Sequence, residues 1–504
     1  MTLGTSANGQ SVDPPSRSDE FVRGLSEAVG GPLGTHAAKS SGPTRYQRVA
    51  QIVLALLCCT LAAHWVQKSP CQDGAWTDLK QYRQMCYTDV LALYYAEGLS
   101  DGQIPYAEHE NEYPVLTGAF MGVLGLPVHA FAKSHPQLNI NQGEWFYNLN
   151  VLVLGGLAIA SGALMLSMRR RRPWDIALFA ISPALFVTAT VNWDLLAVGF
   201  AVFGLYAWSR RYPALAGILL GLGAAAKLWP GFLFLPLLVL GLRSRRFSET
   251  VVAISTGVMT WVAVNLPVLF GYPDAWWKFF KFNNTRAIDW GTIWYLGDHV
   301  PFYGPLANFN WFDQHIQYVN SISYALFGLC CVGIALLAFL APRPPRLAQL
   351  AFLVVAAFLI FSKVWSQQYV LWLLPLAVLA RPRWGAFLAW QLAEVLYFCA
   401  FYGELMGASG KGVFPESVFD LAALLRLVTV AVLAGYVVRD ILRPSLDVVR
   451  TSYDGADPDA GAFADPPAVP PEPGNEPARA GSAAAGSGWN SGSGDRESSP
   501  VPSG

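Results

Sequence analysis

Charged side chains are scarce in this sequence, and those present cancel. Of its 504 residues, 13% are Asp, Glu, Lys or Arg and 53% are hydrophobic. Soluble domains carry about 25% charged residues, so this composition is typical of a membrane protein. The 34 basic and 34 acidic side chains balance, so no net positive charge favours nucleic acid as a partner. The basic residues are informative through their positions instead.

Cysteine is also rare, with seven residues scattered along the chain. Five of them lie in apolar segments, where cysteine usually behaves as a small hydrophobic side chain, so neither a disulfide scaffold nor a zinc site is indicated. Cys71 and Cys86 lie in a polar stretch after the first apolar run. A disulfide between them would close a short loop just before Asp89. Two unpaired thiols are the alternative.

Motifs for nucleotides and metals are absent from the apolar part of the chain. Between residues 46 and 442 there is no Asp-x-Asp pair of the kind found in nucleotide-sugar enzymes, and no glycine-rich phosphate loop. The carboxylates are not spaced as a cation cage. We therefore predict neither a metal nor a cofactor.

Both ends of the chain are poor in aliphatic residues. Residues 1–45 are rich in Ser, Gly and Pro, and residues 443–504 in Pro, Ala, Gly, Ser and Asp. Such segments bury too little apolar surface to offset their ordering entropy. They are predicted to be disordered cytoplasmic tails on one membrane domain of residues 46–442. Because the first apolar run follows a long polar stretch, it is predicted to be an uncleaved anchor.

The basic clusters determine how the apolar segments are threaded. A helix crosses a membrane with about 20 apolar residues, and cytoplasmic loops carry an excess of Lys and Arg. Clusters occur at residues 169–172, 210–211, 243–246, 343–346 and 381–383. Placing all of them inside predicts an all-α bundle of about twelve crossings with both ends of the chain in the cytoplasm. The predicted spans are 46–66, 146–168, 174–191, 193–209, 213–226, 228–242, 251–270, 318–341, 347–362, 368–380, 385–402 and 418–438.

Two large outer loops follow from this threading, at residues 67–145 and 271–317. Residues 114–133 are apolar enough to cross, but a crossing there would put the cluster at 169–172 outside. They are therefore predicted to dip into or lie on the membrane, broken by Pro114, Gly125 and Pro127. A thirteenth crossing is the alternative.

Several polar side chains fall at outer turns of this topology. Asn192, Asp194, Lys227 and Lys363 lie there, on the same side as Asp89. The helices around Lys227 are so short that this lysine is predicted to lie below the outer surface, in a protein-lined cavity, and ionisable groups at such depth are usually functional. The loop 271–317 combines many aromatic residues with amides, acids and bases, as sugar-binding surfaces do. A belt at the membrane interface is the alternative for about half of these aromatic residues.

Asp89 begins an ordered run of motifs: "CYTDVLALYYAEG", "GLSDGQIPY" and "NEYPVLTG". Capping of a helix is the structural alternative for this acid. The run resembles the first outer loop of GT-C membrane glycosyltransferases that use polyprenyl-phosphate sugars, in particular the glycosyltransferase family 87 type of actinobacterial mannosyltransferases. "VNWDLLAVGF", "GLGAAAKLWP" and "SKVWSQQYVLWLLPL" extend the resemblance over most of residues 46–440. Val115 and Gln367 depart from it, at positions where the family commonly has proline.

The resemblance implies inverting transfer of a sugar, mannose in particular, from a polyprenyl phosphate to an envelope glycolipid or glycan at the outer face of the cell membrane. The matching family residue implies that Asp89 is the base. Since the leaving group is an activated lipid phosphate, the enzyme need only position an acceptor, take its proton and neutralise the phosphate. Lys227, Lys363 and Arg286 are the candidates for the phosphate.

Seven further side chains are candidates for binding the sugar or the acceptor. They are Tyr94, Tyr95, Tyr113, Asn192, Asp194, Glu112 and His109. For Asp194 the structural alternative is pairing with a lysine. Glu112 is also a candidate to share the base role, and a solvated loop position is the alternative for both Glu112 and His109.

Two other classes of protein fit part of the pattern. Buried Asp194, Lys227 and Lys363 among about twelve spans would also suit a secondary transporter, although such folds usually have compact loops and inverted repeats. A flippase, or a protein that only presents the lipid-linked sugar, would keep the lysines but would not need Asp89. No protein partner is indicated. Large outer loops on one side favour the enzyme.

Overall fold

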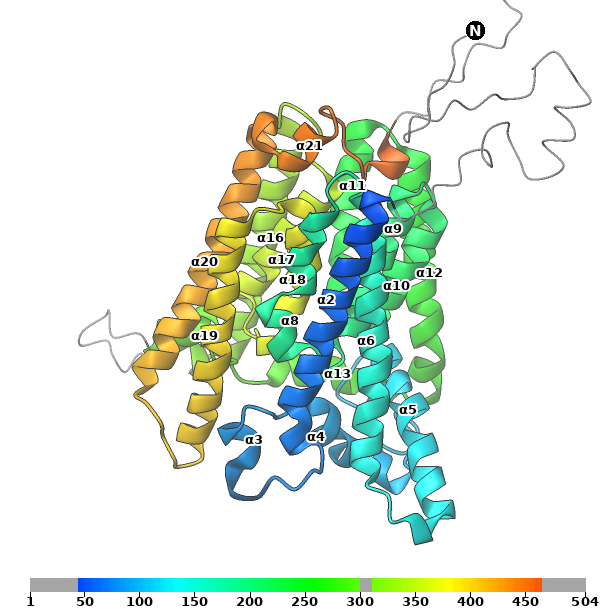
Figure 1. Cartoon of the computed structure of the whole chain (residues 1–504), viewed down its shortest axis with the longest axis vertical. Coiled ribbons are helices and arrows are strands. Elements are labelled where there is room, and N and C mark those ends of the chain that lie inside the picture. The colour runs from blue at the N-terminus through cyan, green and yellow to red at the C-terminus, as the bar shows by residue number, and fades with distance from the viewer. Residues whose placement is uncertain (1–43, 300–310, 465–504) are drawn as a thin grey trace, which may run out of the picture. The chain divides into compact units, whose positions relative to one another are not determined.

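The computed structural model describes residues 44–299 and 311–464, and within these ranges the chain is all-helical (Figure 1). The predicted tail at 1–45 lies almost entirely outside the described residues, as do residues 300–310 of the second outer loop and residues 465–504. The longer helices are α2 (Arg45–Lys68), α5 (Val115–Ser134), α6 (Gln142–Met168), α12 (Phe247–Gly271), α16 (Ile316–Leu340), α19 (Trp384–Ala408) and α20 (Glu416–Leu442).

The shorter helices complete the bundle and its loops. They include α4 (Asp89–Ala96), α8 (Pro183–Thr188), α9 (Asp194–Ser209), α10 (Pro213–Ala226), η6 (Trp229–Leu233), α11 (Phe234–Ser244), α13 (Pro273–Thr285), α14 (Ile293–His299), α17 (Leu347–Phe361), η8 (Gln367–Tyr369), α18 (Val370–Ala380) and α21 (Val448–Ser452). Within the described ranges, seven helices are long and apolar enough to cross a membrane. Six shorter apolar segments lie among them. The chain is therefore an all-α polytopic membrane protein, as the composition predicts.

The basic clusters lie together at one end of the helical bundle. The guanidinium of Arg243 donates to the carbonyl of Ala341 (2.6 Å), and that of Arg169 donates to the carbonyl of Leu379 (2.9 Å). Basic clusters far apart in sequence thus lie together, where α9, α11 and α18 end. Helices of 14 to 16 residues such as α10 and α9 extend about 21–24 Å from this end, less than the roughly 30 Å of a bilayer core. Their other ends stop part-way, where the polar turns gather.

Two predicted segments differ from simple spans. Residues 174–191 form a broken run of short helices, with a turn at Ile181 and Ser182 between α7 (Ala177–Ala180) and α8. Residues 115–134 form one unbroken helix, α5, with Pro127 inside it. The predicted breaks at Gly125 and Pro127 are therefore wrong.

Contacts of α5 place it at the end of the bundle away from the basic clusters. The hydroxyl of Thr117, in its first turn, donates to the carbonyl of Ala226 at the end of α10 (2.7 Å). Near its other end, Phe131 stacks on Trp145 at the start of α6 (5.6 Å). Figure 1 shows α5 beside only the first part of α6. Because α5 begins where α10 stops, it lies beyond that end of α10. It is also one of the seven helices that are long and apolar enough to cross a membrane, so a position in or on the membrane surface stays a prediction, with a thirteenth crossing as its alternative.

Small residues allow α10 and α12 to pack closely. A Cβ on Gly217 would lie 2.0 Å from the carbonyl oxygen of Ala253, and one on Gly221 would lie 2.4 Å from that of Gly257. The spacing of Gly217 and Gly221 is that of a small-xxx-small helix contact in membranes. This contact supports the helix that ends at Lys227.

Residues 443–464 are folded, contrary to the prediction that a disordered tail starts at 443. Asp447 forms an ion pair with Arg346 (2.8 Å), and Asp459 forms one with Arg169; the four side chains are at most 5% exposed. Both guanidinium groups also donate to Leu379 at the end of α18. Composition alone missed this because the segment is held by buried ion pairs and contributes few apolar side chains.

Candidate active site

A cavity of about 620 Å³ lies where the short helices stop. Its polar wall comes from the first outer loop, the turn before α9, the end of α10 and the turn between α17 and η8. Its apolar wall comes from α13, α16, α17 and η6. The polar lining consists of Tyr87, Asp89, Glu112, Tyr113, Asn192, Lys227, Asn283, Asn284, Arg286, Asn320, Ser323, Tyr324, Ser362, Lys363, Ser366, Gln368 and Tyr369.

Asp89 is the first residue of α4, and Thr88 is the residue that caps this helix. The Thr88 hydroxyl accepts from the backbone N–H of Val90 and donates to the carbonyl of Thr190 (2.6 Å). The backbone N–H of Asp89 donates to the carbonyl of Val191 (2.8 Å). The helix-cap alternative for Asp89 is therefore wrong. Its carboxylate is left to face the cavity.

The carboxylate of Asp89 is held by two neighbours. The amide NH₂ of Asn192 donates one hydrogen to Asp89 Oδ2 (2.7 Å) and the other to the hydroxyl oxygen of Tyr113 (2.6 Å). The hydroxyl of Tyr87 donates to the same acid. Burial raises the pKa of Asp89, and the hydrogen bonds from Asn192 and Tyr87 oppose that rise. The result is an oriented carboxylate with a pKa nearer neutrality than that of a free aspartate.

Lys227 has a partner within the chain. Its ammonium lies 3.0 Å from Asp194 Oδ1, which also accepts a hydrogen bond from the indole of Trp372 (2.6 Å). The ammonium lies over the rings of Tyr113 and Tyr369, 5.7 and 5.4 Å from their centroids. Asp194 itself is fully buried and does not line the cavity. The structure thus shows the lysine pairing considered for Asp194.

Lys363 has a different environment. Its ammonium donates to the carbonyls of Asn284 (3.0 Å) and Arg286 (2.9 Å), at the end of α13. Within the described ranges, neither Lys363 nor Arg286 has a carboxylate at ion-pair distance. Burial, followed by the nearby charge of Arg286, lowers the pKa of Lys363 to about 8. These two cations leave positive charge facing the cavity.

Glu112 also lines the cavity, near Asp89. Burial and then the charge of Asp89 raise the pKa of Glu112, and Arg286 and Lys278 lower it. Glu112 therefore lies in the outer loop, half-buried, with its side chain at the cavity. The cavity is thus lined by two carboxylates from the first outer loop and by two cations, one from the turn after α17 and one from the end of α13, that have no carboxylate at ion-pair distance within the described ranges.

Three predicted ligands lie outside the cavity. Tyr94 is buried against Phe146 (4.7 Å between rings), and its hydroxyl donates to Gln142. Tyr95 is 48% exposed on another face of α4. His109 lies next to Gln103 and Glu97 in the outer loop. None of the three faces the space between Asp89 and Lys363.

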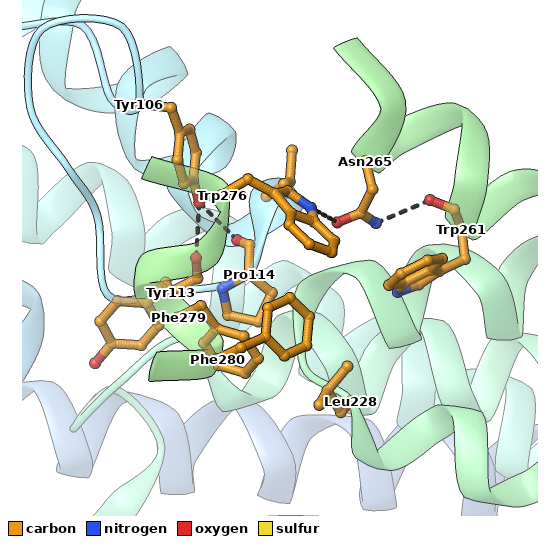
Figure 2. Close-up of a pocket in the computed structure, with 10 residues that line it drawn as sticks. Tyr106, Tyr113, Pro114, Leu228, Trp261, Asn265, Trp276, Phe279 and Phe280 are labelled. Carbon is orange, nitrogen blue, oxygen red and sulfur yellow. Dashed lines mark hydrogen bonds between the residues drawn. The ribbon is translucent and has the colours of Figure 1, made fainter. Parts of the chain in front are cut away.

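A second, water-sized crevice of about 10 Å³ adjoins the cavity and explains how Tyr113 is placed (Figure 2). The hydroxyl of Tyr106 lies 2.9 Å from the carbonyls of both Tyr113 and Pro114. On the opposite side, the indole of Trp276 on α13 donates to Asn265 on α12 (2.9 Å). The crevice is too small for a substrate, and its contacts fix the loop that carries Tyr113.

Other cavity residues were not predicted as site residues. Tyr87 and Tyr369 lie inside quoted motifs but carry no charge that would single them out. Asn284 is placed by α13 and accepts a hydrogen bond from Asn320 on α16. Helical periodicity was a usable signal in α4. Leu93, one turn after Asp89, lines the cavity, whereas Tyr94 and Tyr95 point elsewhere.

A disulfide joins Cys71 to Cys86. Both side chains are buried, and Cys86 immediately precedes Tyr87. The ammonium of Lys68, at the end of α2, donates to the carbonyl of Tyr87 (3.1 Å). The segment that leads to Asp89 is therefore anchored to the first helix and cross-linked to the loop that follows it.

The fold and the cavity define a polytopic membrane protein in which Asp89 lines the same cavity as two cations, Lys363 and Arg286, that meet no carboxylate among the residues the structure describes. The family model of glycosyltransferase family 87 matches residues 119–364. The chain is a membrane glycosyltransferase resembling family 87, as the motifs predict. The matched stretch contains Asn192, Lys227, Arg286 and Lys363 but not Asp89. No curated protein matches the chain.

Proposed function

We propose that the protein transfers a sugar, mannose by family resemblance, from a polyprenyl phosphate to an envelope glycolipid or glycan, with inversion, on the outer face of the cell membrane. The observation that carries the proposal is that one cavity is lined both by a carboxylate that can accept a proton and by cations that can bind a phosphate. Asp89 is oriented by Asn192, and Lys363 and Arg286 line the same space.

Asp89 is proposed as the general base. The acceptor hydroxyl would attack the anomeric carbon while its proton passes to the Asp89 carboxylate. The bond between that carbon and the phosphate oxygen would break, and the electron pair would leave with the phosphate. Attack opposite to the leaving group inverts the anomeric centre. The raised pKa of Asp89 suits a base that works near neutral pH.

Lys363 and Arg286 are proposed to bind the donor phosphate. An ammonium has three donors, and two of those on Lys363 are used by carbonyls. The third remains for a phosphate oxygen. Lys227 is already neutralised by Asp194, so it contributes less net charge. Its proposed role is to hold Tyr113 and Tyr369 beneath the sugar.

Glu112, Asn192 and Tyr113 are proposed to contact the acceptor or the sugar, because each lines the cavity next to Asp89. Tyr94, Tyr95 and His109 are not included. The apolar wall, with Phe232, Phe327 and Phe358, is proposed to accommodate part of a lipid substrate. That no metal is required remains a prediction.

The test compares wild type with Asp89→Asn in lipid nanodiscs, using radiolabelled polyprenyl-phosphate mannose and extracted membrane acceptors. Asn keeps the shape of the side chain but cannot take a proton. Transfer by wild type and a loss of at least about 100-fold in the variant are expected for removal of a general base. If wild type binds the donor but transfers no sugar, and Asp89→Asn binds the donor equally well, the protein would instead be a carrier or a presenting protein.

A further inference from the structure

Arg426 is a fully buried arginine in the middle of α20, outside the cavity lining. Its guanidinium forms an ion pair with Glu394 on α19 (3.1 Å), and the two side chains are 0% and 2% exposed. The guanidinium also lies against the rings of Trp365 and Tyr397, 4.3 and 4.2 Å from their centroids. A charge at this depth is costly and usually has a functional role.

The remaining donors of Arg426 bind a turn that lines the cavity. One terminal nitrogen donates to the carbonyl of Trp365 (2.9 Å) and the other to the carbonyl of Ser366 (3.1 Å). A planar guanidinium presents five donors in a fixed fork, so it can bind two adjacent carbonyls and a carboxylate at once. Arg426 thus contacts residues 362–369 on the side of the turn away from the cavity.

The front of the same turn presents cavity residues. Lys363, Ser366, Gln368 and Tyr369 all line the cavity. The Ser366 hydroxyl donates to Asp289 (3.1 Å), whose backbone N–H donates to the carbonyl of Lys363 (2.9 Å). The hydrogen bonds from Arg426 to the carbonyls of Trp365 and Ser366 therefore help to position the segment that carries the Lys363 ammonium.

We propose that Arg426 is a positioning residue for the donor phosphate site, acting through the turn 362–369 on Lys363. This inference rests on the proposed function. A purely structural role would be met by an apolar pair in place of Arg426 and Glu394, because a buried ion pair often adds no net stability over such a pair. The two carbonyl contacts are the part of the arrangement that an apolar pair would not reproduce.

The test uses two variants and one matched control. Arg426→Gln/Glu394→Gln removes both charges together, so no buried charge is left unpaired. Arg426→Lys keeps a charge beside Glu394 but replaces the fixed two-nitrogen fork, which binds the two carbonyls, by a single nitrogen. Glu394→Gln is the control for the ion pair, because it leaves the carbonyl contacts in place. Since it also leaves the Arg426 charge buried without its carboxylate, it should lower the unfolding temperature but not affect donor binding. Each protein is checked by thermal unfolding, then assayed for donor KM, acceptor KM and kcat, and for binding of polyprenyl phosphate alone.

Loss of hydrogen bonds from a charged donor should raise the donor KM and the Kd for polyprenyl phosphate about tenfold in both variants. We expect kcat and acceptor KM to change less than about twofold, and Glu394→Gln to stay within about threefold of wild type. Unchanged donor KM and Kd in both variants would overturn the inference. So would failure of both variants to fold, since Arg426 would then act in folding.

The inference and the proposed function fail differently. Wild type that neither transfers sugar nor binds polyprenyl phosphate would overturn the proposed function, and the role of Arg426 with it. Wild type that does both, beside variants with wild-type donor KM, would overturn the role of Arg426 alone.

Discussion

The two ends of the helical bundle differ in whether their cationic side chains have carboxylate partners. At the basic end, guanidinium groups are buried with carboxylates: Arg346 with Asp447, and Arg381 with Asp440 (3.1 Å). At the cavity, Lys363 and Arg286 have no carboxylate at ion-pair distance within the described ranges. A charge that serves the fold has its partner in the chain, whereas a charge kept for binding leaves a position for a ligand.

Breaking a pair at the basic end should have the largest effect. Asp447→Ala leaves Arg346 buried without its carboxylate, and loss of one member of a buried pair costs about 3–5 kcal/mol. We expect a clearly lower unfolding temperature in detergent, with activity lost in proportion to folded protein. Asp454→Ala is the control, because its pair with Arg171 is 85% exposed on the Asp454 side. Equal unfolding temperatures for the two variants would contradict the assignment of residues 443–464 to the fold.

Removing the charge of Lys363 should change the donor KM more than removing that of Lys227. Lys363→Gln is expected to raise the donor KM by about 10- to 100-fold, because it removes a charge-assisted contact to phosphate. Lys227→Gln/Asp194→Asn removes a neutral pair as a unit and should change the donor KM by no more than about threefold. The measurement is initial-rate kinetics in nanodiscs. A reversed order would place the phosphate at Lys227.

The pH dependence of donor use should follow Lys363. Its ammonium must be protonated to bind phosphate, and its pKa is lowered to about 8. Affinity for the donor is therefore present below pH 8 and falls as pH rises through that value. Lys363→Arg, which stays protonated, should remove this alkaline limb. At the acid side, kcat/KM should fall as Asp89 becomes protonated, at a pH above the usual range for aspartate because its pKa is raised. An alkaline limb unchanged by Lys363→Arg would contradict the assignment of that limb to Lys363.

The smallest effect should distinguish tyrosines inside and outside the cavity. Tyr113→Phe removes the hydroxyl bound by Asn192 and should lower kcat/KM by about tenfold, the size of one hydrogen bond near a charge. Tyr94→Phe removes a hydroxyl that donates to Gln142, outside the cavity, and kcat/KM should stay within about twofold. Similar losses for both would mean that the first outer loop is rearranged when substrate binds.

Most of the fold could be predicted because its signals are local. Apolar runs and basic clusters located the helices, and the short runs around Lys227 indicated a cavity below the surface. The gathering of Asp89, Asn192, Lys227 and Lys363 followed from placing their turns on one side. These predictions needed only periodicity, length and the distribution of positive charge.

The rest depended on tertiary contacts that no local pattern contains. Residues 443–464 resemble a disordered tail until Asp447 and Asp459 meet arginines more than 100 residues away. Arg426 lies in an apolar helix, and its role depends on a turn that precedes it by 60 residues. Pairing of Lys227 with Asp194 was one of two alternatives for that acid, and only the contact decides between them.

The short helices that end at the cavity also have an electrical consequence. With the cavity on the outer side, as proposed, a phosphate that reaches Lys363 would have entered part of the voltage drop across the membrane. A full crossing by one charge is worth about 2.3 kcal/mol per 100 mV, and a partial entry is worth a corresponding fraction. An energised membrane that is negative inside would therefore weaken binding of the anionic donor, so the rate of transfer would report on membrane potential as well as on substrate supply.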